Sequence, residues 1–208
     1  MTPPIPIAWV LRANTTGFTV GCRLLEPAMP QFGDFVKVAV TDELNVIGVT
    51  YDVQVNDDPS VRQLILAGDM EPAVILDQRQ NRLVPIEISV LAVGYERDQV
   101  YFHNLPPQPP ISLDTLHPCT AEDIVGFTRE RETYRLDYLR LIAKSRQVPS
   151  DELIIANLLH AANHYAPERR RSFLLDAARE VSRLLNADII RLDGILRQIR
   201  WALQLTNR

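Results

Sequence analysis

The sequence has few residues of the kinds that tie a chain to a metal, a disulfide framework or a membrane. Its two cysteines, Cys22 and Cys119, lie far apart and belong to no C-x-x-C pair. This argues against a zinc knuckle or a disulfide scaffold and predicts two buried thiols. Residues 1–6 lack the positive and apolar stretches of a secretory signal, and no later apolar run approaches the ~18 residues of a membrane-spanning helix. We therefore expect a cytoplasmic protein without a membrane span.

Motifs for phosphate binding and hydrolysis are also lacking. The eight glycines are scattered, and neither a G-x-x-x-x-G-K-S/T loop nor a G-x-S-x-G elbow occurs. We therefore expect neither a catalytic role nor a cofactor. An enzyme whose catalytic residues are dispersed through the fold would leave no linear motif, and it stays open as an alternative.

Positive charge is carried almost entirely by arginine, because Lys37 and Lys144 are the only lysines. Residues 1–110 hold 7 basic and 13 acidic side chains, whereas residues 111–208 hold 15 and 13. Arginine forms bidentate contacts with phosphate, so the densest arginine cluster is the candidate nucleic-acid contact. Its members are Arg169, Arg170, Arg171, Arg179 and Arg183. Acidic residues are interleaved with these arginines. This favours the alternative, in which the arginines form salt bridges on the helices.

The hydrophobic residues, 46% of the chain, follow two different patterns. From residue 5 to 101, short apolar runs alternate with Gly, Pro, Asn and Asp, which indicates many short strands. The run from Phe35 to Val40 is almost continuously apolar, as in a barrel wall covered on both sides. Gly48 within the next run indicates a bulge or a barrel corner. The predicted strands are 7–11, 18–24, 35–41, 45–54, 73–76, 83–92 and 99–102.

Two segments interrupt or end the β region. Residues 59–69 begin with Pro59, which follows Asp57 and Asp58, and they show helical spacing, which predicts one short helix. Residues 105–110 contain four prolines in six positions and therefore form neither a helix nor a central strand. The predicted fold class is α+β, with a small β-barrel domain over 1–105, a proline-rich linker over 106–119 and an all-α helical bundle over 120–208.

The C-terminal part has helical periodicity throughout. Thr120 is a predicted N-cap for a helix that runs to Lys144, and further helices are expected over 151–165, 167–185 and from about residue 188 onward. The last helix carries a stripe at 3-4-3-4 spacing, with Trp201 beside it, which makes it a candidate subunit interface. These candidate interface residues are Ile189, Leu192, Leu196, Ile199, Trp201 and Leu203. Packing of the stripe on helices of the same chain is the alternative.

His160 and His164 are four residues apart on a predicted helix, so their rings can share one face, as two metal ligands must. Ala161 stands where a zinc protease H-E-x-x-H pattern needs its glutamate, and the sequence identifies no third ligand. The pair is therefore interpreted as solvated or interface histidines, and no metal site is predicted.

The β region resembles the HAS-barrel, the small barrel found in the N-terminal parts of HerA-type DNA-translocating ATPases and of F-type ATP synthase subunits. The resemblance covers residues 5–125 and rests on strands, glycines and prolines. The segments that carry it are 33–38 (GDFVKV), 45–49 (NVIGV), 88–94 (ISVLAVG) and the proline-rich exit 105–110.

The resemblance implies a role in ring assembly and in docking a partner protein. In the HerA-type family the barrel precedes a P-loop ATPase core, whereas this chain continues with helices and no phosphate loop. ATP hydrolysis is therefore not implied. The predicted function is a non-catalytic assembly or docking protein, a homo-oligomer or a partner of other proteins, within a DNA-processing or ATPase-associated complex. Nucleic-acid binding by the arginine-rich helices is the alternative.

Overall fold

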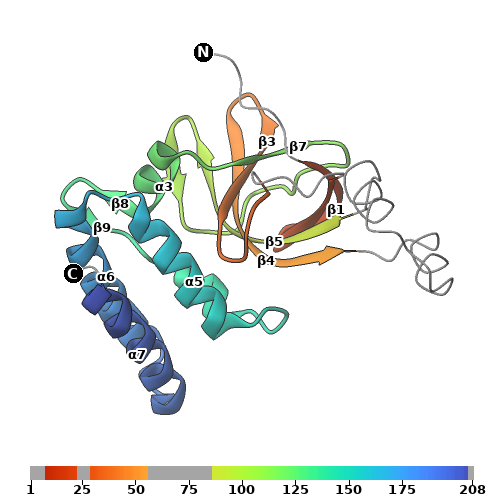
Figure 1. Ribbon diagram of the computed structural model, residues 1–208. Coiled ribbons are helices and arrows are strands. Elements are labelled where there is room, and N and C mark those ends of the chain that lie inside the picture. Colours follow the sequence, from red (N-terminus) through yellow and green to blue (C-terminus); the bar gives the residue numbers. More distant parts are fainter. Residues whose placement is uncertain (1–7, 23–28, 56–85, 206–208) are drawn as a thin grey trace, which may run out of the picture.

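The computed structural model describes residues 8–22, 29–55 and 86–205. The helix expected over 59–69 and the strand expected over 73–76 lie outside these residues. Seven strands form the main sheet: β1 (Ala8–Asn14), β2 (Gly17–Cys22), β3 (Phe35–Thr41), β4 (Leu44–Val55), β5 (Ile86–Arg97), β6 (Val100–Phe102) and β7 (Thr115–Pro118). The order is β2-β1-β7-β3-β4-β5-β6, and β2 also pairs with β5 (Figure 1). The second pairing closes six of the strands into an antiparallel barrel.

The barrel interior is filled by small and β-branched side chains. Ala8, Val10, Val20, Val36 and Val38 are all buried there. Gly48 lies at a break in the register between β4 and β5, as its position in the sequence predicted. A Cβ at this position would lie only 2.3 Å from Val90 Cγ1, so the inward approach of β4 requires a glycine. The α+β class with a β-barrel is thus confirmed.

Strand β7 lies within the range 106–119 that was predicted to be a linker. It sits between β1 and β3, and Leu116 pairs with Ala8 on one side and Val38 on the other. Four residues with a proline at the end give too weak a strand pattern for the sequence to reveal it. The chain therefore returns to the barrel after the proline run, before the helices begin.

Five helices are described after the barrel: α3 (Ala121–Thr128), α4 (Leu139–Lys144), α5 (Ser150–Asn163), α6 (Pro167–Leu184) and α7 (Ile189–Leu205). Thr120 caps α3 as predicted, since its hydroxyl accepts from Asp123 N and its N–H donates to Asp123 Oδ2. The continuous helix expected from Thr120 to Lys144 is wrong. A hairpin of β8 (Arg129–Glu130) and β9 (Thr133–Tyr134) interrupts it. Residues 129–133 (RERET) offer no apolar side chain that a helix could bury.

A second core joins the outside of the barrel wall to the helices. It combines Phe35, Val49 and Val93 of the barrel with aromatic residues of the helical part such as Phe127 and Tyr138. Helix α5 lies between the barrel and the pair α6 and α7 (Figure 1). The barrel thus uses both faces of its wall, which explains the continuously apolar sequence of β3.

Candidate functional site: the outer face of helix α7

Helix α7 has an inner face that completes the chain's own core. Ile195 and Ile199 are each only 1% exposed, and Leu192 and Leu203 pack against the same core. Most of the predicted apolar stripe therefore packs within the chain. Ile195, which lay outside that stripe, is one of the two most buried residues of the helix. The start of α7 is also fixed, because Arg191 Nε donates to both Asp151 carboxylate oxygens at 2.9 and 3.1 Å.

The opposite side of α7 is apolar at both ends and exposed. Ile190 is 88% exposed and Trp201 is 60% exposed. They are separated by about three helical turns, so both lie on the same side of the helix. Gly194 and Arg197 lie between them on this side, and no atom lies within 4 Å of the point where a Cβ of Gly194 would stand. We call Ile190, Gly194, Arg197 and Trp201 the outer face.

A hollow of about 300 Å³ lies beside Trp201. Leu159 of α5 and Leu174 of α6 contribute apolar walls, and Arg170 borders it. The Arg170 guanidinium is held in place because its Nε donates to the carbonyl oxygen of Ala162 at 3.2 Å. The indole of Trp201 thus stands at the edge of a preformed, mostly apolar depression, an arrangement typical of contact sites for another side chain.

The outer face also carries one ion pair along the helix. Arg197 Nη2 bonds to Asp193 Oδ2 one turn earlier, and both side chains are largely exposed. Exposed pairs of this kind add little stability to a helix. They are therefore available to exchange partners at a contact between molecules.

The predicted nucleic-acid residues lie together on α6, and two of the five are paired with carboxylates of the same helix. Arg179 bonds to Asp176 at 2.6 Å, and Arg183 bonds to Glu180 at 2.9 Å. Within the part of the chain that the structure describes, Arg169 and Arg171 are the two members of the cluster that are exposed and have no carboxylate partner. The ion pairs that Arg179 and Arg183 form within α6 each join residues three apart on this helix.

A polar cluster beside β3 has its charged groups paired with each other. Lys37 Nζ lies 2.7 and 2.8 Å from the two oxygens of Asp123, which also caps α3. Burial alone would raise the pKa of Asp123, but hydrogen bonds from Lys37 and Thr120 lower it. Burial raises the pKa of the nearby Cys119 thiol. The thiol is therefore protonated at neutral pH and unsuited to act as a nucleophile.

His103 is another titratable group outside the outer face. It is 2% exposed, and its Nε2 lies 2.8 Å from the carbonyl oxygen of Phe127, so this nitrogen carries the proton. Burial lowers the pKa of His103 to about 4. The ring is therefore neutral at physiological pH and too enclosed to exchange protons with a substrate.

Neither protein-family models nor curated protein sequences give a significant match to the chain. Among the helices of the described residues, none combines the length and the apolar character needed to cross a membrane.

Proposed function

We propose that the chain is a non-catalytic assembly protein that associates with a second copy of itself through the outer face of α7. The observation that carries the proposal is the exposure of Ile190 and Trp201 on a helix whose other face is already packed. Large aromatic residues at the edge of a hollow are typical anchors of protein interfaces. A helix that is apolar on both sides is normally covered on both sides.

An antiparallel pairing of two copies makes the outer face complementary to itself. If the twofold axis passes midway between Gly194 and Arg197, Trp201 of one copy faces Ile190 of the other. Gly194 then faces Arg197 of the second copy, and the missing Cβ leaves room for the arginine stem. Such a twofold contact buries the same residues on both copies and closes at a dimer.

Charge supports the same register. Arg197 already lies next to Asp193 within its own helix. In the antiparallel pair each Arg197 also approaches Asp193 of the other copy, so opposite charges meet across the axis. Trp201, which this register sets opposite Ile190 of the second copy, also borders the hollow. Because one helix face is small for a specific interface, we expect dissociation constants of roughly micromolar order.

The broader assignments from the sequence are part of this proposal. The closed barrel supports a resemblance to the HAS-barrel, and with it a docking role for the barrel in a DNA-processing or ATPase-associated complex. Helices α5, α6 and α7 contact one another, which supports their description as a bundle that presents the outer face. Nucleic-acid binding stays an alternative, and salt-dependent retention of nucleic acid by the purified protein would favour it over self-association.

Cysteine cross-linking tests the proposed register. In a Gly194→Cys variant the new thiols lie close to the twofold axis, so mild oxidation should give a covalent dimer on a non-reducing gel. The matched control is Arg200→Cys, which places an exposed thiol on the flank of the same helix. Absence of a cross-link at Gly194→Cys, or equal cross-linking of both variants, would contradict the register.

A further inference from the structure

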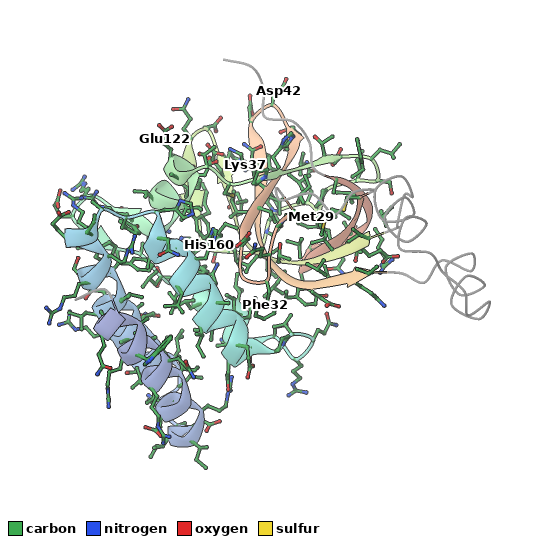
Figure 2. The ribbon with its side chains drawn as sticks, in the orientation of Figure 1. Met29, Phe32, Lys37, Asp42, Glu122 and His160 are labelled. Atoms are coloured by element: carbon green, nitrogen blue, oxygen red, sulfur yellow. The ribbon has the colours of Figure 1, made fainter. Side chains whose placement is uncertain are left out.

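The two histidines of α5 come together in a geometry that the sequence only partly revealed. His160 lies on α5 and His164 is its C-cap residue, and their Nε2 atoms are 3.2 Å apart. The ring centroids are 4.9 Å apart with an interplanar angle of 57°. Figure 2 shows His160 on α5, on the side of the helix that faces the barrel. Two ring nitrogens therefore lie within 3.2 Å of each other beside the barrel.

A carboxylate from the barrel orients one of the rings. Asp34 Oδ1 lies 2.9 Å from His160 Nδ1. The other oxygen, Asp34 Oδ2, accepts from Gln31 N at 2.8 Å, and the Asp34 carbonyl accepts from Thr50 N at 3.0 Å. Asp34 is thus held by the barrel from several sides. Its position places the proton of His160 on Nδ1 and leaves a lone pair on Nε2.

We propose that His160 and His164 bind a divalent transition-metal ion through their Nε2 atoms, with Asp34 as the residue that orients His160. Zinc–nitrogen bonds are about 2.0–2.1 Å long, so two ligands at a tetrahedral angle are separated by about 3.3 Å. The observed separation of the Nε2 atoms is 3.2 Å. A histidine ligand that donates its other ring N–H to a carboxylate is the usual arrangement at metal sites.

The number and type of ligands define which ion fits. In the described ranges, 8–22, 29–55 and 86–205, no group of three or more His, Cys, Asp or Glu side chains is placed to hold a metal. The described residues therefore supply two ligands, and solvent would complete the coordination. Two imidazole nitrogens favour Zn²⁺, Ni²⁺ or Cu²⁺ over Mg²⁺ or Ca²⁺, which prefer oxygen. Both rings are partly exposed, so the ion enters from solvent.

The protons balance without any other reactant. With the proton of His160 on Nδ1, the hydrogen bond between the rings is donated by His164 Nε2. When the ion binds, this proton moves through solvent to His164 Nδ1, and the freed lone pair becomes the second ligand. Each imidazole stays neutral, as metal ligation requires.

Calorimetric titration of the full chain with Zn²⁺ and with Mg²⁺ tests the site. We expect one Zn²⁺ per chain, no Mg²⁺ binding, and loss of the Zn²⁺ signal in His160→Gln and in His164→Gln. His117→Gln is the matched control, because His117 is a partly exposed histidine on β7 and not one of the pair. The affinity of this variant for Zn²⁺ should equal that of the wild type. Asp34→Asn should weaken Zn²⁺ binding about 10–100-fold.

Two outcomes would overturn the inference: Zn²⁺ affinity that is the same in both histidine variants as in the wild type, or equal loss in His117→Gln. Electron paramagnetic resonance of the Cu²⁺ complex gives an independent readout. Hyperfine splitting from two nitrogens is expected for the wild type, and from no more than one nitrogen in either histidine variant. Neither histidine belongs to the outer face. Failure of the metal site would therefore not affect the proposal of self-association, and failure of self-association would not affect the metal site.

Discussion

The helical layer has two boundaries: the junction between the barrel and α5, and the outer face of α7. They differ in how completely their side chains are covered and paired. At the junction, the fully buried Asn157 accepts from Tyr138 OH at 2.7 Å and donates from Nδ2 to Gly33 O at 2.9 Å. At the outer face, Ile190 and Trp201 are exposed, and Trp201 borders an open hollow. The junction is a boundary within the fold, whereas the outer face has the properties of a boundary between molecules.

The largest expected effect is at the junction. Asn157→Leu leaves the Tyr138 hydroxyl and the Gly33 carbonyl buried without their partner, so the free energy of unfolding should fall by about 2–5 kcal/mol. Urea denaturation at pH 7 measures this. The matched control is Asn163→Leu, which changes an exposed residue near the end of the same helix and should alter stability by less than about 0.5 kcal/mol. Similar losses in both variants would mean that the buried amide does not hold the junction.

Substitutions on the two faces of α7 should change the free energy of unfolding by different amounts in the same assay. Ile199→Ala removes a side chain that is 1% exposed, and we expect a loss of about 2–4 kcal/mol. Ile190→Ala, on the exposed side, should change the stability of the monomer by less than about 0.5 kcal/mol. Comparable losses in the two variants at low protein concentration would remove the distinction between an inner and an outer face.

The sequence predicted the strands and helices that carry a strong local pattern. The short apolar runs predicted β1 to β6, and Thr120 as an N-cap predicted the start of α3. Strand β7 was missed because its place in the barrel depends on pairing with β1 and β3, which are distant in sequence. The hairpin at 129–134 was missed because its charged residues lie between two segments of helical periodicity.

The two candidate sites show a similar limit. Helix α7 is apolar on two sides, so spacing alone could not tell which side α5 and α6 would cover. Periodicity grouped Ile189 with Ile199, whereas the structure exposes the first and buries the second. The spacing of His160 and His164 was visible in the sequence, but the carboxylate of Asp34 reaches them from another part of the fold. A contact between segments that are remote in the chain cannot be predicted from a single sequence.

Buried His103 should make the stability of the protein depend on pH. The pKa of His103 is lowered by burial from 6.5 to about 4 in the folded state, so below pH 6.5 the unfolded chain takes up a proton that the folded chain does not. This contribution is fully present above pH 6.5 and is lost as the pH falls toward 4. The stability lost in this way between pH 7 and pH 5 is about 2 kcal/mol.

His103→Gln should remove this term while it keeps an N–H that can donate to the Phe127 carbonyl. The measurement is the difference between the unfolding free energies of wild type and variant at pH 7 and at pH 5. The variant should lose about 2 kcal/mol less over this interval. Parallel pH profiles would contradict the assignment of His103 as a neutral buried ring.

The central claim, self-association through the outer face, is tested most directly by sedimentation velocity over a wide range of protein concentrations. The wild type should shift from monomer to dimer as concentration rises, whereas an Ile190→Ser/Trp201→Ser variant should stay monomeric, and the unfolding free energy of its monomer should match that of the wild-type monomer. The matched control is Leu175→Ser, which removes an exposed apolar side chain of α6 that is not part of the outer face, and it should still dimerise. A wild type that remains monomeric at every concentration, or a double variant that dimerises as well as the wild type, would contradict the account.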